Sequence, residues 1–167
     1  MQKQPVVVRP ANEPDLGDIN DIYNHYVLHS TCTYQEEPET IEDRQQWFRR
    51  HGDQHPVIVA ELQHRIVGWG SLSAYHARSA YRRTVENSVY VHHGFHRQGI
   101  GSFLLKELIA RARNLGHHVI IAAIDADQPA SIRLHERADF KTVGHMTHLG
   151  FKFNRWLDVI YMELLLD

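Results

Sequence analysis

The chain has 167 residues, 43% of them hydrophobic, which is enough for one domain with a sizeable core. Its formal net charge of −2 is close to neutral, so the composition indicates neither nucleic acid nor an anionic membrane as a main partner. Fourteen histidines are many for this length, but no Cys/His spacing typical of a metal framework connects them. We therefore expect histidines scattered over the surface and no bound metal.

Three features of the sequence bear on the cellular compartment of the protein. The segment Met1 to Pro5 lacks the apolar core of a signal peptide, and no apolar run approaches the ~20 residues of a transmembrane helix. The single cysteine, Cys32, cannot form an internal disulfide. The sequence therefore predicts a cytoplasmic protein that does not bind a membrane.

The hydrophobic periodicity predicts strands and helices that alternate along the chain. In chain order we expect a strand over residues 6–9, helices over 15–28 and 41–50, strands over 57–62, 66–74 and 84–91, a helix from Ser102, a strand over 119–124, a helix over 130–138, and closing strands over 141–153 and 157–166. The sequence contains no internal repeat, low-complexity tract or linker. These features predict one α/β domain over residues 1–167, with a mixed, mostly antiparallel sheet flanked by helices.

A glycine-bearing loop connects the strand over 84–91 to the helix that follows. It reads Arg97, Gln98, Gly99, Ile100, Gly101, Ser102. The first turn of a helix carries unpaired N–H groups and the positive end of the dipole, and glycines let a phosphate approach the backbone, so the loop suits an anion. A P-loop would need a lysine before its Ser, and a dinucleotide fingerprint would need a third glycine. A helix start with two convenient glycines remains the alternative.

The loop resembles the acyl-CoA-binding motif of the GNAT superfamily of N-acetyltransferases, Q/R-x-x-G-x-G/A, with His96 at the first position. The resemblance implies a GNAT-like domain that uses acetyl-CoA as co-substrate, bound by Arg97, Gln98, Gly99, Ile100, Gly101 and Ser102. Residues 125–140 resemble the second CoA segment of the family, with Gln128 in place of Asn and Asp139 in place of Gly. This part of the resemblance implies that Gln128 and Ser131 contact CoA.

Further segments narrow the resemblance to one branch of the family. Residues 22–24, 78–81, 84–91, 130–135 and 151–158 look like the phosphinothricin and methionine sulfoximine N-acetyltransferases. The branch implies transfer of an acetyl group to the amino group of a small amino-acid-like molecule, by a homodimer. An aromatic run over 151–156 also indicates a contact surface. Acetylation of another amine, such as a polyamine or a peptide N-terminus, and a non-catalytic acyl-CoA-binding module are the alternatives.

Two residues are candidates for proton transfer. Glu86 lies on a strand between apolar neighbours, where burial would raise the pKa of its carboxyl and suit it to act as a general base. The alternative is a solvated Glu86 paired with Arg82 or Arg83. His135 occupies the helix position where many family members have the Tyr that protonates the departing thiolate, and the alternative is a histidine that packs or forms a hydrogen bond at the buried edge of the helix.

The resemblance also assigns binding roles around Glu86. It implies that the backbone of Val89, Tyr90 and Val91 holds the pantetheine arm as an added strand would. It implies that Arg78, Ser79, Ala80, Tyr81 and Glu86 hold the amine substrate. The guanidinium of Arg78 could bind a carboxylate or phosphinate through two parallel hydrogen bonds, and the alternative is a solvated cation in a loop.

Overall fold

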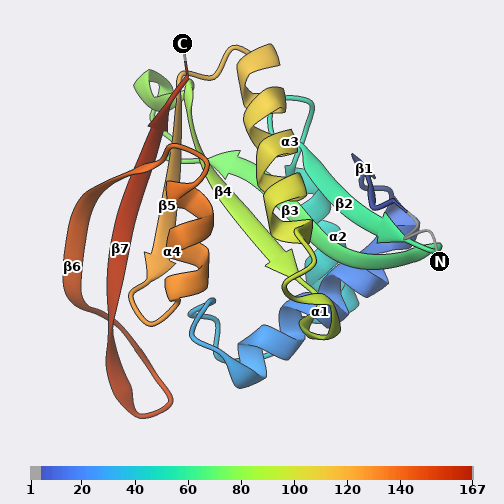
Figure 1. Cartoon of the computed structure of the whole chain (residues 1–167), viewed down its shortest axis with the longest axis horizontal. Coiled ribbons are helices and arrows are strands. Elements are labelled where there is room, and N and C mark those ends of the chain that lie inside the picture. The colour runs from blue at the N-terminus through green and yellow to red at the C-terminus, as the bar shows by residue number, and fades with distance from the viewer. Residues whose placement is uncertain (1–4, 167) are drawn as a thin grey trace.

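The structure, a computed structural model, describes residues 5–166, in which seven strands form a single sheet with four α-helices around it (Figure 1). The strand order is β1-β2-β3-β4-β5-β7-β6. All neighbouring strands are antiparallel except β4 and β5, which are parallel. This arrangement confirms the predicted α/β domain with a mixed, mostly antiparallel sheet. In the same residues no helix is long and apolar enough to cross a membrane.

The observed elements follow the predicted order, with small differences at their ends. The strands are β1 (Val7–Pro10), β2 (Val57–Leu62), β3 (Arg65–Ala74), β4 (Thr84–Val91), β5 (Val119–Asp125), β6 (Lys141–Lys152) and β7 (Arg155–Leu165). The helices are α1 (Leu16–His29), α2 (Ile41–Arg50), α3 (Ile100–Asn114) and α4 (Pro129–Glu136). Three short 3₁₀ turns that the periodicity did not predict lie at Glu13–Asp15, Ser79–Tyr81 and His93–Phe95.

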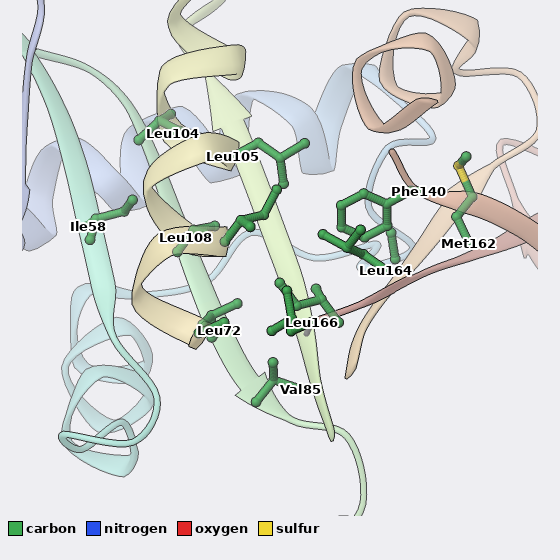
Figure 2. Packing of buried hydrophobic residues seen from close by; sticks show 14 of the residues in the cluster. Ile58, Leu72, Val85, Leu104, Leu105, Leu108, Phe140, Met162, Leu164 and Leu166 are labelled. Atoms are coloured by element: carbon green, nitrogen blue, oxygen red, sulfur yellow. The ribbon is translucent and has the colours of Figure 1, made fainter. Parts of the chain in front are cut away.

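Two hydrophobic clusters cover the two faces of the sheet. The larger cluster packs α3 against β2, β3 and β4 and continues to Phe140 and Met162, as Figure 2 shows. The smaller cluster joins α1 to β2 and β3 around Trp69, whose exposed fraction is 2%, with Trp47 of α2 packed against it. Helices α1 and α2 therefore lie on the opposite face of the sheet from α3 (Figure 1).

The sheet opens between its two parallel strands. Pairing between β4 and β5 covers only Thr84 to Glu86 opposite Val119 to Ile121. On its other side, β4 stays paired with β3 from Val85 to Val91. We call the region beyond Glu86, where β4 has no strand partner on the β5 side, the β4–β5 split.

Strands β6 and β7 form a long hairpin at the far edge of the sheet, and it reaches past α4 in Figure 1. Its turn holds Phe153 and Asn154 at positive φ angles of 51° and 59°. Phe151, Phe153 and Trp156 near this turn are about half exposed, at 49%, 52% and 59%. The hairpin therefore presents the aromatic run to solvent.

Candidate active site

The face of the sheet that carries α1 and α2 holds a polar strip centred on Glu86. Tyr90 packs into the smaller cluster, and residues two apart on a strand share a face, so Ser88 and Glu86 point the same way as Tyr90. Cross-strand partners also share a face, and three pairs extend the strip onto β3. We call this strip the Glu86 face; its pairs are Glu86 with Ser73, Ser88 with Ser71 and Tyr90 with Trp69.

The Glu86 carboxyl is half-buried in this strip. Burial raises the pKa of Glu86 above its ordinary value, and no charged neighbour offsets the shift. No ion pair joins Glu86 to Arg82, Arg83 or any other residue within 5–166. A partly desolvated carboxylate without a cation partner is suited to accept a proton near neutral pH.

The backbone of β4 is available to a ligand on its other edge. His92 donates its N–H to Val67, so alternate residues of β4, among them Glu86, Ser88 and Tyr90, direct their backbone groups toward β3. The backbone groups of Asn87, Val89 and Val91 therefore face the β4–β5 split. The phenol of Tyr26 donates a hydrogen bond to the Val91 carbonyl. The N–H and C=O groups of Val89 lie in the part of β4 that no strand covers, where an extended amide-bearing chain could pair with them.

The glycine loop stands at the same end of β4. Gly99 is the N-cap of α3 with φ +80°, a left-handed conformation that glycine adopts without strain. The N–H groups of Ile100, Gly101 and Ser102 follow as unpaired donors of the first helical turn. A Cβ on Gly101 would lie 3.3 Å from Leu134 of α4, so α3 and α4 approach closely here. These features fit the pyrophosphate of CoA.

The side chain of His96 is turned away from that loop. Its Nε2 lies 2.6 Å from the Tyr26 hydroxyl, which itself donates to Val91, so Nε2–H is the donor of this hydrogen bond. Arg97 and Gln98 are exposed beside Gly99, and the φ of Arg97 is +61°. The His96 side chain thus binds Tyr26, while the N–H donors at the start of α3 belong to the backbone of residues 100–102.

His135 is buried between α4 and β4, with an exposed fraction of 3%. Its Nδ1 lies 2.8 Å from the Ser131 carbonyl, which can only accept, so Nδ1 carries the proton. The amide nitrogen of Asn87 donates to its Nε2 over 2.9 Å, and burial lowers the pKa of His135. Both ring nitrogens are occupied in a neutral imidazole, and this favours the packing alternative over a proton donor.

Residues 30–34, which we call the 30–34 loop, connect α1 toward α2 and lie at the end of β5. Asp125, 5% exposed, accepts hydrogen bonds from Thr31 Oγ1 at 3.1 Å and from the Tyr34 hydroxyl at 2.6 Å. The Gln128 amide donates to Ser30 Oγ and Thr31 Oγ1 at 3.3 and 3.2 Å. The predicted CoA contact of Gln128 therefore remains a prediction, and its side chain already has protein partners.

The predicted substrate loop lies at the other end of the Glu86 face. Arg78, Ser79, Ala80 and Tyr81 are all exposed, and the last three form a 3₁₀ turn between β3 and β4. The Tyr81 ring packs edge-on against Tyr75 with centroids 5.7 Å apart. Because β4 starts at Thr84, this loop ends five residues before Glu86 in the sequence.

The histidines differ from the scattered surface arrangement that we expected. His117 and His135 are buried, and His25 of α1 stacks on His93 with ring centroids 3.9 Å apart. His93 in turn stacks on His92 at 4.4 Å. No group of three or more His, Cys, Asp or Glu within residues 5–166 has the arrangement of a metal site.

Comparison with known proteins agrees with this geometry. The model of the Acetyltransferase (GNAT) family matches residues 19–140. A methionine sulfoximine/methionine sulfone acetyltransferase of Salmonella typhimurium is 37% identical over 163 residues, which cover 97% of this chain and 95% of that protein.

Two solved structures superpose on the chain with a TM-score of 0.94 each. One is a phosphinothricin acetyltransferase from Sinorhizobium meliloti in complex with acetyl-CoA, 36% identical, with 98% of this chain and 89% of that chain covered. The other is a ribosomal-protein-alanine N-acetyltransferase from Brucella melitensis, 38% identical, with 96% and 99% covered. The chain belongs to the GNAT family of acetyltransferases.

Proposed function

We propose that the protein transfers the acetyl group of acetyl-CoA to the amino group of a small amino-acid-like substrate of the phosphinothricin or methionine sulfoximine type. The observation that carries the proposal is the position of Glu86. Its half-buried carboxyl, whose pKa burial raises, lies on the strand whose free edge forms one side of the β4–β5 split. One strand thus offers both a base for the amine and a backbone for the acyl donor.

The backbone groups at the start of α3 and along β4 bind the acyl donor. The backbone of Gly99, Ile100 and Gly101 binds the pyrophosphate, and Val89 and Val91 pair with the pantetheine arm. The Val89 N–H is the donor available to the acetyl carbonyl oxygen as negative charge develops there. These assignments follow the free edge of β4 and the unpaired helical donors of α3.

Proton removal falls to Glu86. An ammonium is not a nucleophile, so the carboxylate must accept one of its protons before or as nitrogen attacks the carbonyl carbon. The C–S bond of the thioester then breaks, CoA leaves as a thiolate, and the thiolate takes the second proton that the nitrogen loses, so the products are the amide and free CoA thiol. The amine lies on the Glu86 face, where Ser73 and Ser88 provide hydroxyls beside the carboxylate. His135 keeps its proton on Nδ1 and serves by packing α4 against β4 rather than as the acid that protonates the thiolate.

The substrate class rests on the relatives and on the exposed loop before β4. Arg78 is exposed there and can bind a carboxylate or phosphinate with two parallel hydrogen bonds. A peptide N-terminus is the second candidate, because the Brucella melitensis protein is as similar to the chain as the Sinorhizobium meliloti one. A free amino acid presents a carboxylate close to its amine, whereas a peptide N-terminus does not.

Release of free thiol from acetyl-CoA tests the proposal. We expect release with methionine sulfoximine, methionine sulfone or phosphinothricin, and little with spermidine or with a short peptide that begins with alanine. Release with the peptide alone would move the assignment to the second candidate. Acetyl-CoA binding without release on any amine would support a non-catalytic acyl-CoA-binding module.

We further propose that the protein is a cytoplasmic homodimer that associates through the β6–β7 hairpin. The half-exposed Phe151, Phe153 and Trp156 form an aromatic surface near its turn. Exposed aromatic residues of this kind are enriched at protein contacts.

A further inference from the structure

Lys152 near the end of β6 is almost completely buried although it carries a charge. Its exposed fraction is 2%, whereas its neighbours Phe151 and Phe153 are 49% and 52% exposed. Lysine is rarely buried without partners, because removing an ammonium from water is costly. Burial lowers the pKa of Lys152 accordingly. Something specific must therefore compensate this group.

Two backbone carbonyls of the 30–34 loop provide the compensation. Lys152 Nζ donates to the Ser30 carbonyl at 2.8 Å and to the Thr33 carbonyl at 2.9 Å. These carbonyls lie at the two ends of a segment without regular secondary structure, whose backbone cannot pair with a strand or helix of its own. A single ammonium thus fixes both ends of the loop to the hairpin.

Neighbouring groups hold the same loop from the same side. A Cβ on Gly150 would lie 2.4 Å from the Tyr34 ring, so only glycine lets this ring lie on β6. The Tyr34 hydroxyl then reaches Asp125 at 2.6 Å and the Asp158 carbonyl at 3.2 Å. Both groups belong to the C-terminal part of the sheet, as Lys152 does.

The loop in turn touches the Glu86 face. Thr33 Oγ1 and the Tyr23 hydroxyl share a hydrogen bond of 2.9 Å, and the Tyr23 ring packs edge-on against Tyr90 at 5.4 Å. Tyr90 lies two and four residues from Ser88 and Glu86 on the same side of β4. A displacement of Thr33 would therefore reach, through Tyr23, the Tyr90 side chain on the Glu86 face.

We propose that Lys152 is a positioning residue that fixes the 30–34 loop against the Glu86 face and so sets the affinity for the amine substrate. This role rests on the proposed function, since it assigns the amine to the Glu86 face. The CoA cradle at Gly99 to Ser102 lies on a different loop and should not depend on it. Gln128, whose side chain donates to Ser30 and Thr31 of the 30–34 loop, is not part of this cradle.

Lys152→Met tests this role, because Met has a similar length and no donor. We expect the KM for the amine to rise at least fivefold, with the KM for acetyl-CoA and the kcat at saturating amine within twofold of wild type. Backbone amides of residues 31–34 should exchange with deuterium at least fivefold faster in the variant without any substrate. Lys141→Met changes an exposed lysine at the other end of β6 and should alter none of these quantities.

Equal increases in both KM values, or unchanged exchange in residues 31–34, would overturn the proposal. If Lys152→Met does not fold, Tyr34→Phe removes the two hydrogen bonds of its hydroxyl and keeps the ring on Gly150. It should then raise the amine KM selectively, and no selective effect would count against the loop contact. The exchange experiment needs no substrate, so it tests the role of Lys152 even if the proposed amines are not acetylated.

Discussion

Replacement of Glu86 by Gln tests the proposed base with little change in shape. The carboxamide fits the same half-buried site, and the wild-type carboxylate has no ion pair within residues 5–166 that the change could break. Stability and acetyl-CoA affinity should therefore stay close to wild type. Turnover at pH ~7 should fall by about 10²–10⁴, which corresponds to about 2.7–5.4 kcal/mol of activation free energy.

The role of Glu86 as a base also predicts how activity changes with pH. Activity requires the unprotonated carboxylate, so wild-type kcat/KM should fall as pH decreases through the pKa of Glu86. Because burial raises that pKa above 4.5, the decrease should begin at a higher pH than for an exposed glutamate. The α-amino group of a peptide has a pKa near 8. The carboxylate of a free amino acid stabilises its ammonium and raises this pKa further, so well under about one-tenth of the substrate is free base at pH ~7. The deficit of Glu86→Gln should therefore shrink as pH rises past ~8, where the substrate supplies its own free base.

Thiol release measured between pH ~6 and ~9, with acetyl-CoA affinity from calorimetry, provides the assay. Glu107→Gln is the matched control, since Glu107 lies on α3 and pairs with Arg111 one turn away. Losing that pair should cost about 0.3–0.5 kcal/mol of stability and no turnover. A Glu86→Gln variant with wild-type kcat at pH ~7 would refute the reasoning, and proton removal would then belong to water or to another group.

Three further predictions concern the CoA loop, the hairpin and the ion pair at the start of α1. Gly101→Val should raise the acetyl-CoA KM strongly because its side chain would press on Leu134, while His96→Ala should change it little; the opposite ranking in calorimetry would contradict a backbone cradle. Trp156→Ser should shift a micromolar dimer toward monomer in sedimentation, and a wild-type monomer would disprove the proposed dimer. Arg9 lowers the pKa of the buried Asp15, so this pair stabilises the fold above pH ~4, and its contribution is lost as pH falls through the lowered pKa of Asp15. Asp15→Asn should lower the free energy of unfolding by about 1.5–3 kcal/mol. In thermal unfolding, this variant should also lack the part of the acid dependence that Asp15 causes.

Elements with strong local signals could be predicted from the sequence. Helix α2 has its predicted bounds, Ile41–Arg50, because Thr40 accepts a hydrogen bond from the Asp43 N–H as an N-cap. Strand β4 also has its predicted bounds, Thr84–Val91. Helix α3 begins two residues before the predicted Ser102, with Gly99 in a left-handed conformation as its N-cap. The spacing of apolar residues does not reveal the φ angle of Gly99, and so it does not locate the N-cap of α3.

The site divides in the same way between local and distant contacts. The glycine loop and the strand that carries Glu86 could be located because each is a continuous motif. The partners of the 30–34 loop could not, since Lys152 and Ser30 are 122 residues apart in the sequence. Asn87 and His135 are 48 residues apart, and their contact occupies Nε2 of the imidazole whose Nδ1–H the Ser131 carbonyl accepts. The sequence does contain one signal of the Lys152 contact that sequence reasoning missed. Side chains alternate between the two faces of a strand, so Lys152 must point away from the face that Phe151 and Phe153 share.

The use of one strand for two substrates follows from the geometry of a β-strand. Side chains leave a strand perpendicular to the sheet, while the N–H and C=O groups lie within the sheet. Glu86 therefore points to the face that carries α1 and α2, and the backbone of Val89 points sideways into the β4–β5 split. In the proposed reaction the amine and the acyl donor approach β4 in directions about 90° apart and meet beside one strand. Such a site requires that β5 leave β4 directly after Glu86, so the opening of the sheet is a condition of the proposed chemistry.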